Sequence, residues 1–265
     1  TLFFIHIGPH NDVMIKIVHS IAQFTFLEVT RNRFIWLIVV ALGGALGVAE
    51  FLSDVALSET ERFQSAVLGA LLRASAVFLV ALFVVTSLTR ELNDKGLEML
   101  LALPIPRGAF LAGKLLGFGA APLVLTTLFG LAAAVHTPAE QALIWSISLF
   151  LELLLIAGLS VLCLFTFSQV PAAIATVLGF YVLARTIAAL QLIGHGPMQI
   201  DPSIAQSAAV HVIDAIAWLL PELHHFTRTD WLVYHSATWS DLLPVAGQSA
   251  IYMAVIVGAA AFDLH

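Results

Sequence analysis

Long apolar runs, separated by short polar stretches, dominate the pattern of this chain. A helix crosses the hydrocarbon core of a bilayer with about 20 apolar residues at a rise of 1.5 Å per residue. Six runs meet or approach this length, at residues 34–52, 66–88, 111–135, 141–167, 171–193 and 245–262. The pattern therefore predicts an all-α integral membrane protein with six transmembrane helices.

A further helix is predicted before the first span, within residues 14–33. Apolar residues recur there at helical spacing, at Ile17, Ile21, Phe24 and Leu27. This favours an amphipathic helix lying in the membrane interface. A cleaved signal peptide fits less well, because no small-residue cleavage site precedes the full-length span. Residues 1–13 lack an initiator methionine, so we expect them to be upstream sequence and residues 14–265 to form one membrane domain.

Composition agrees with a membrane protein and excludes several other classes. Hydrophobic residues make up 60% of the chain and charged residues 11%, whereas soluble domains have about 45–50% and 25%. With 11 Lys and Arg against 17 Asp and Glu, the sequence cannot form the basic face that a nucleic-acid partner requires. The single Cys163 excludes a disulfide framework or a cysteine-based metal cluster within this sequence.

The positions of Lys and Arg predict the orientation in the membrane. Seven of them precede the first span or lie between the second and third, at Lys16, Arg31, Arg33, Arg90, Lys95, Arg107 and Lys114. The opposite side has only Arg62 and Arg228. Since cytoplasmic loops are enriched in Lys and Arg, we expect a multi-pass protein of the cytoplasmic (inner) membrane with its N-terminus in the cytoplasm. The His-rich segment 194–244 then faces outside.

The segment between the second and third spans is the most charged part of the chain. Four leucines (Leu92, Leu97, Leu100 and Leu101) can share one helical face, while the charged residues between them take the other face. Pro104 and Pro106 then stop the helix. We expect a surface helix that offers its charges to a soluble partner; the alternative is a plain solvated loop.

This segment also carries a resemblance to a known family. The pattern Arg90-Glu91, Gly96, Glu98, Leu100-Leu101, Pro104, Arg107 and Gly113-Lys114 resembles the segment after the second span of type-2 ABC-transporter permeases. Six spans, an N-terminal interfacial helix and an external helical segment before the last span are similar to that family as well. The resemblance implies a coupling helix that meets an ATPase subunit through Arg90, Glu91, Asp94, Lys95, Gly96, Glu98 and Arg107.

The resemblance also implies partners and a mechanism. We expect two copies of a cytoplasmic ABC ATPase subunit, a second permease subunit in a homodimer or heterodimer, membrane lipid around the spans, and alternating access without enzymatic chemistry in this chain. No cofactor is expected in the chain itself. Residues 108–114 do match the spacing of a phosphate-binding loop, but Leu115 follows Lys114 where a magnesium-binding hydroxyl is needed. ATP and Mg²⁺ should therefore bind in the partner subunit.

A second stretch bears on the branch of the family. Residues 218–226, with the sequence WLLPELHHF, are similar to a stretch before the last span in the branch linked to maturation of multicopper enzymes, including nitrous-oxide reductase. The basic tail expected after a last span that exits into the cytoplasm is missing at His265. We therefore expect the C-terminus to be truncated.

Ionisable residues inside the spans are expected to form pairs, because each costs at least about 2.5–3.5 kcal/mol near the bilayer centre. Counted from the tight turn at Gln169 and Val170, Glu152 and Arg185 differ in depth by roughly 3 Å. A similar count places Glu50 level with Arg73. The pairs Glu152–Arg185 and Glu50–Arg73 would either fix the packing of helices or line a substrate path.

Five histidines fall in the segment expected outside, at His195, His211, His224, His225 and His235. Imidazole ligands suit copper or zinc, but no His-x-His or His-x-x-x-His pair occurs among them. The alternative is an apolar helix at 204–220 that rests on the membrane and carries interfacial histidines. Two other functions stay open: an integral-membrane metal-dependent enzyme using these histidines with Glu222 or Asp214, and a non-transporting assembly factor for an extracytoplasmic metalloenzyme.

Overall fold

A computed structural model describes Gln23, Thr25, Glu28 and residues 34–55, 60–93, 107–167, 169–195 and 204–263. Over these residues every regular element is a helix. The long ones are α2 (Phe34–Val55), α3 (Thr60–Asn93), α5 (Arg107–Phe118), α6 (Ala120–Ala133), α7 (Ala139–Phe167), α8 (Val170–Gly194), α9 (Ile204–Leu219) and α11 (Leu242–Asp263). Three short helices lie between α9 and α11, namely η1 (Leu223–His225), α10 (Thr229–Tyr234) and η2 (Trp239–Asp241).

The prediction of six membrane-spanning helices is confirmed for the described part of the chain. Stretches long and apolar enough to cross a bilayer run over Phe34–Leu52, Thr60–Asn93, Ala112–Ala133, Ala139–Phe167, Val170–Gly194 and Trp239–Phe262. Helix α3 is longer than predicted, with 34 residues. At 1.5 Å per residue it is roughly 51 Å long, so its polar ends extend beyond the hydrocarbon core.

The third span is built from two helices, α5 and α6, that meet at Gly119. Pro122 lies in the first turn of α6 and lacks the N–H that would continue the helical ladder. Helical i to i−4 hydrogen bonds span the junction, from Gly119 N to Leu115 O (3.1 Å) and from Leu123 N to Gly119 O (3.2 Å). Because Pro122 has no N–H, the helical ladder of this span lacks one hydrogen bond at the junction.

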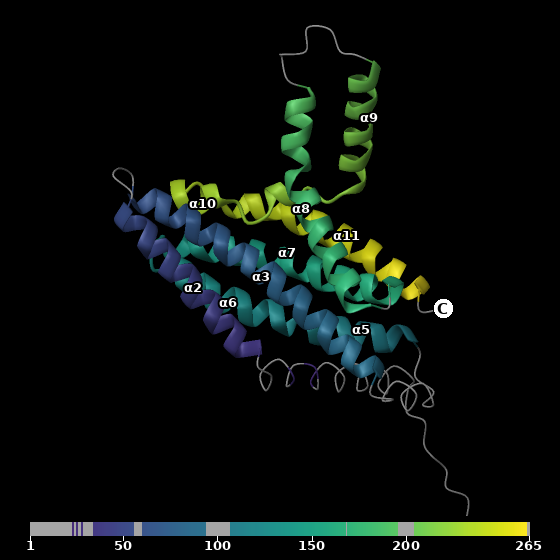
Figure 1. Ribbon diagram of the computed structural model, residues 1–265. Coiled ribbons are helices and arrows are strands. Elements are labelled where there is room, and N and C mark those ends of the chain that lie inside the picture. The colour runs from purple at the N-terminus through teal and green to yellow at the C-terminus, as the bar shows by residue number, and fades with distance from the viewer. Residues whose placement is uncertain are drawn as a thin grey trace, which may run out of the picture.

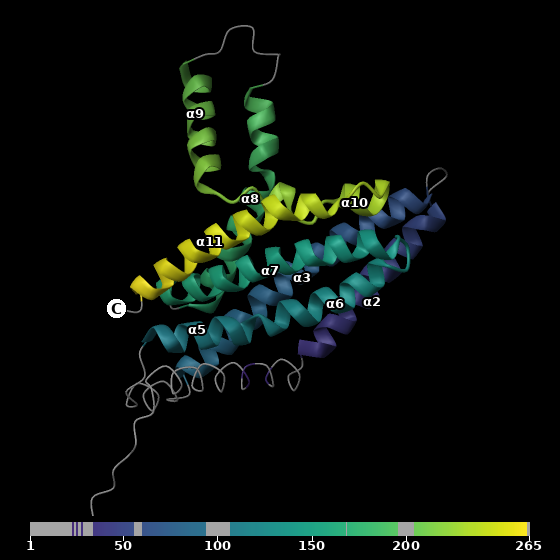
Figure 2. The same cartoon turned by 180° about the vertical axis from the view of Figure 1, so that it is seen from behind.

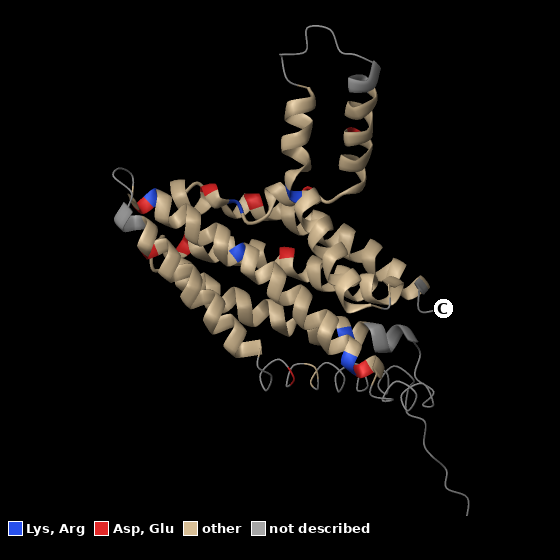
Figure 3. Ribbon diagram, in the orientation of Figure 1, with Lys and Arg blue, Asp and Glu red and all other residues tan. Residues whose placement is uncertain are grey.

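Helix α7 forms the centre of the bundle. It packs against α3, α6, α8 and α11, while α2 packs mainly on α3 (Figure 1). Its Trp145, Leu149 and Leu153 side chains are fully buried. The view from behind shows the same arrangement, with α11 and α2 towards opposite sides of the bundle (Figure 2). Lys, Arg, Asp and Glu positions lie mostly towards the two ends of the bundle, and only a few lie between them (Figure 3).

Helix α9 and the last part of α8 stand side by side and project beyond the bundle (Figures 1 and 2). The hydrogen bond from Gln191 Nε2 to Asp214 Oδ1 (3.0 Å) joins them. Helix α9 corresponds to the helix expected at 204–220, and it ends at Leu219. Residues 220–241, which we call the cap segment, then return across one end of the bundle, where α10 contacts α3 and α7.

Some expected elements lie outside the described residues. Of the interfacial helix predicted over 14–33, the structure describes three residues, Gln23, Thr25 and Glu28, and each is helical. Residues 94–106 of the predicted coupling segment, and residues 1–13, are not among those described.

Candidate functional site

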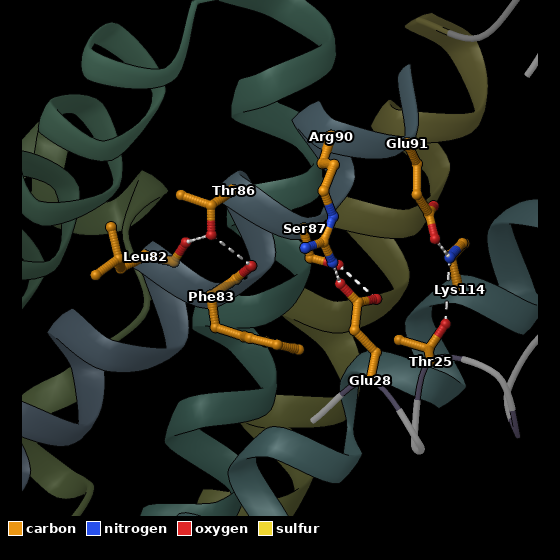
Figure 4. Close-up of polar contacts among 9 residues, drawn as sticks. All are labelled: Thr25, Glu28, Leu82, Phe83, Thr86, Ser87, Arg90, Glu91 and Lys114. Carbon is orange, nitrogen blue, oxygen red and sulfur yellow. Dashed lines mark hydrogen bonds and ion pairs between the residues drawn. The ribbon is translucent and has the colours of Figure 1, made fainter. Parts of the chain in front are cut away.

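Lys114 on α5 joins two other segments at one end of the bundle, which we call the Lys114 end (Figure 4). Its side chain is only 5% exposed, and its ammonium group forms an ion pair with Glu91 at the end of α3. The same group donates to Thr25 Oγ1 (3.2 Å) and lies 5.7 Å from the centroid of the Phe118 ring. The charge of this buried lysine is therefore balanced by one carboxylate, one hydroxyl and one aromatic face.

Glu28 forms the second ion pair of this end. Its carboxylate pairs with Arg90 on α3 and accepts a hydrogen bond from Ser87 Oγ (2.9 Å). Glu28 is 11% exposed and Arg90 is 56% exposed, so water reaches the arginine more than the carboxylate. Ion pairs and hydrogen bonds thus join Thr25 and Glu28 of the N-terminal segment to the end of α3 and to α5 (Figure 4).

Close packing accompanies these charges. A Cβ added at Gly117 on α5 would lie 2.6 Å from Thr25 Cβ, which is far inside van der Waals contact. Only glycine at this position lets the N-terminal segment approach α5 closely enough for Thr25 to reach Lys114.

A second polar cluster is buried within the bundle around Glu152 on α7, which we call the Glu152 cluster. The Glu152 side chain has no exposed surface, and its Oε1 lies 3.5 Å from Arg185 Nη1 on α8. The Thr227 hydroxyl of the cap segment donates to Glu152 Oε2. The Thr227 backbone N–H donates to Ser148 Oγ on α7 (2.9 Å). The cap segment is thereby fixed to α7 by both backbone and side-chain bonds.

Two arginines complete this cluster by donating to backbone carbonyls of the cap segment. Arg73 on α3 donates to Thr227 O (3.0 Å). Arg185 donates to Phe226 O (2.7 Å) and Thr227 O (3.3 Å), and also to Leu223 O. The carbonyls of Phe226 and Thr227 follow the short 3₁₀ turn η1 and have no continuing helix to supply donors, so the guanidinium groups supply them instead. Leu223 O, at the start of that turn, also accepts from Phe226 N (3.1 Å).

The charges in the Glu152 cluster do not cancel one to one. Arg73 and Arg185 bring two positive charges to the single carboxylate of Glu152. The carbonyl oxygens of residues 223, 226 and 227 supply the remaining negative potential as dipoles. Thr227 adopts a left-handed backbone with a φ of 45°, which is rare for a β-branched residue. The surrounding bonds must therefore hold it in that conformation.

The rest of the cap segment is held by the start of α7. Gln141 Nε2 donates to Ala237 O (3.1 Å), and Ala237 N donates back to Gln141 Oε1 (2.9 Å). Trp239 Nε1 donates to Glu140 Oε1 (3.0 Å). The cap segment is thus an integral part of the bundle at this end.

Residues 19–262 match the model of a family described as ABC-2 family transporter protein. The chain belongs to this ABC-2 family. It is therefore a multi-pass membrane subunit of an ABC transporter, as the pattern between the second and third spans predicted, and a transport subunit is favoured over an enzyme. A comparison with curated proteins finds no match. The likeness of residues 218–226 to the multicopper-maturation branch stays a prediction.

The residues predicted to contact an ATPase fall into three groups in this ABC-2 chain. Arg90 and Glu91 end α3, and both are engaged in the ion pairs of the Lys114 end. Arg107 is the first residue of α5, and its side chain is not described. The remaining four, Asp94, Lys95, Gly96 and Glu98, lie outside the described residues.

The structure brings together one of the two predicted membrane pairs. Glu152 and Arg185 meet at 3.5 Å. Glu50 Oε1 instead lies 3.7 Å from His136 Nε2, and Arg73 donates to the cap segment. The predicted Glu50–Arg73 pair is therefore wrong. The residue count gave the two side chains the same depth in the membrane, but Arg73 points towards the Glu152 cluster and not towards Glu50 on α2.

The five histidines predicted as metal ligands do not form one cluster. His195 Nε2 lies 3.4 Å from Asp214 Oδ2, His211 is exposed on α9, and His235 is exposed where α10 ends. His224 and His225 lie together on η1, with ring centroids 4.0 Å apart. Glu222 joins them, and one ligand atom from each of these three residues lies within 4.8 Å of the others.

Several residues of these sites were not predicted from the sequence. Thr25, Glu28, Ser148, Thr227 and Gln141 all make bonds that connect distant segments. One signal was available on α7, because Gln141, Ser148 and Glu152 are spaced by seven and four residues and so share a helical face. A polar stripe on an otherwise apolar span indicates a buried polar partner.

Proposed function

We propose that this ABC-2 subunit couples to a cytoplasmic ABC ATPase through the Lys114 end, and that two such permease subunits with two ATPase subunits move a substrate by alternating access. ATP and Mg²⁺ would bind in the ATPase. The observation that carries the proposal is the pair of ion pairs that tie the N-terminal segment, α3 and α5 together directly beside the most charged segment of the chain. The family implies an ATPase as the partner.

The charge distribution supports placing this end in the cytoplasm. Arg90, Lys95, Arg107 and Lys114 all belong to it or to the segment beside it, and cytoplasmic loops are enriched in such residues. The N-terminus would then be cytoplasmic, and the cap segment would face the opposite side of the inner membrane.

The ion pairs would act as positioning contacts for coupling. Closure of the ATPase subunits would push on the segment around Asp94, Lys95, Gly96, Glu98 and Arg107. The Glu91–Lys114 pair would pass that displacement from α3 to α5. The junction at Gly119, where Pro122 removes one hydrogen bond from the helical ladder, would offer a place where α5 can pivot. Binding energy in the ATPase interface would thereby shift the equilibrium between two states of the bundle.

The Glu152 cluster would have a structural role in this mechanism. Its two arginines each donate to carbonyls of the cap segment, and Thr227 is bonded through its backbone and its hydroxyl. Arginines and a threonine bonded in this way favour a fixed junction over a substrate path. Glu152 Oε1 has its ion pair with Arg185 but no hydrogen-bond partner among the described residues. The bundle would then move at the Lys114 end around a rigid junction of α3, α7, α8 and the cap segment.

Co-purification with an ATPase subunit tests the proposed contact surface. The double variant Asp94→Arg plus Glu98→Arg leaves the four ion-paired residues of the Lys114 end unchanged. We expect it to lose the ATPase subunit during purification while keeping its folded yield. The matched control, Glu61→Arg plus Asp230→Arg, reverses two acidic charges near the other end and should retain the partner. Stable binding by the first variant would contradict the proposed surface.

A further inference from the structure

We propose that Glu222, His224 and His225 form a binding site for one divalent transition-metal ion of borderline softness, such as Zn²⁺. The site lies on the cap segment and is independent of the ATPase-coupling function. It offers two imidazole nitrogens and one carboxylate oxygen, a donor set that suits Zn²⁺ and leaves a coordination position open for water.

The distances between the three side chains support this assignment. One ligand atom from each lies within 4.8 Å of the others, and His225 Nε2 is 3.5 Å from Glu222 Oε2. Ligand atoms bound tetrahedrally at about 2.0–2.2 Å from zinc lie roughly 3.3–3.6 Å apart. The cluster therefore needs to contract by only about 1 Å to close around an ion. The side chains of His225 and Glu222 are 52% and 59% exposed, so both have room to turn.

The local backbone holds the three residues in place. Glu222 precedes the short helix η1, and His225 is its last residue. Residues three apart lie above one another in a 3₁₀ turn, which puts Glu222 and His225 on the same side. Leu223 and Phe226 are buried, and Arg185 binds the carbonyls of both. The turn that carries the three side chains is thus anchored before any ion arrives.

The electrostatics are mixed but compatible with a cation. His224 Nδ1 is buried without a hydrogen-bond partner among the described residues, so a ligand could satisfy it. Neutral imidazole is the form that binds metal. Arg185 and Arg228 add positive potential, which Glu222 opposes. We therefore expect weaker binding than at a closed structural zinc site.

The other histidines of segment 194–244 bring fewer potential metal ligands together. His195 has Asp214 as a neighbour, which makes two ligands. Within the part of the chain that the structure describes, no second group of three His, Cys, Asp or Glu ligand atoms comes so close together. The sequence alone could not single out this trio, because adjacent histidines show no metal-ligand spacing until the 3₁₀ turn brings Glu222 beside them.

Metal binding to the purified full chain tests the site. We expect about one Zn²⁺ per chain by calorimetric titration, with the bound ion counted by elemental analysis after dialysis. The variant Glu222→Gln plus His225→Ala changes two exposed side chains and should weaken binding at least about tenfold. His235→Asn replaces an exposed histidine outside the trio with a residue that tolerates its left-handed backbone, and it should bind as the unchanged chain does.

Each outcome of this experiment decides the proposal. Loss of Zn²⁺ in the double variant with retention in His235→Asn supports the site, provided that both variants elute as folded protein. Unchanged stoichiometry in the double variant, or no Zn²⁺ bound to the unchanged chain, would overturn it. Mg²⁺, which prefers oxygen ligands, should not compete; displacement of Zn²⁺ by Mg²⁺ would also contradict the assignment.

Discussion

The Lys114 end and the Glu152 cluster both join distant helices through charges, but they do so in different ways. At the Lys114 end each charged group has side-chain partners, and Arg90 is 56% exposed. In the Glu152 cluster the carboxylate has no exposed surface, and the arginines donate mainly to backbone carbonyls. Ion pairs near water can break and reform at low cost, whereas buried groups without water have no alternative partner.

This difference suggests a division of labour within the bundle. In the coupling that we propose, contacts near the ATPase must be able to rearrange, and contacts deeper in the bundle must stay fixed. Of the ion pairs at the Lys114 end, Glu28–Arg90 with its 56% exposed arginine comes nearest to the first property, and Glu91–Lys114 with its 5% exposed lysine is more confined. The Glu152 cluster has the second property. Four substitutions would break or sharpen the contrast, and they differ in their expected cost to stability.

Glu152→Gln should have the largest effect. It leaves the half-buried Arg73 and Arg185 without a carboxylate, and removal of one partner from a buried ion pair costs about 3–5 kcal/mol. We expect a sharp loss of folded protein in the membrane and a lowered thermal unfolding temperature in detergent. Normal assembly and stability combined with lost transport would show instead that the cluster lines a substrate path.

Lys114→Met should cost less, because its partner Glu91 is 24% exposed and water can solvate it once the lysine is gone. The loss of hydrogen bonds to charged groups is worth about 1.5–3 kcal/mol. Thermal unfolding of purified protein measures this change. A loss as large as that of Glu152→Gln would remove the contrast between the two regions.

Thr227→Ala tests the hydroxyl that binds Glu152. Loss of that hydrogen bond destabilises the fold, but alanine relieves part of the strain of a left-handed β-branched residue. We therefore expect a net loss of about 1–2 kcal/mol in the free energy of unfolding. Thr227→Ser keeps the hydroxyl and should change stability little. Equal destabilisation by the two variants would show that the hydroxyl is not the important group.

Arg90→Met should have the smallest effect on stability. An ion pair with one exposed partner contributes about 0–1 kcal/mol, and Glu28 keeps its hydrogen bond from Ser87. Its unfolding temperature should lie close to that of the unchanged chain. A cost above that range would mean that this end is as rigid as the Glu152 cluster.

The spans and one buried pair could be predicted from the sequence because both follow from distance along a helix. Apolar length gave the six spans, and residues counted from the turn at Gln169 gave the equal depth of Glu152 and Arg185. The same count failed to give Arg73 its partner. Depth depends on the number of residues, whereas the direction in which a side chain points depends on how the helices pack around one another.

The contacts that the sequence could not give are those between segments far apart in the chain. Thr227 lies 75 residues from Glu152, and Glu28 lies 62 residues from Arg90. Both depend on where irregular or N-terminal segments settle on the bundle. Helical periodicity carries no information on that placement. The sequence therefore could not predict that carbonyls of the cap segment accept hydrogen bonds from Arg73 and Arg185.

The most direct test of coupling through the Lys114 end is the ATPase activity of the reconstituted complex after a charge swap. Glu28→Arg and Arg90→Glu should each reduce activity to well below that of the unchanged complex, because each places like charges together. The double swap restores the ion pair and should restore most of the activity, while a swap of Arg228 and Asp230, which pair at 3.1 Å in the cap segment, should leave it unchanged. Full activity in both single variants, or a double swap as impaired as they are, would contradict the role of these ion pairs in coupling.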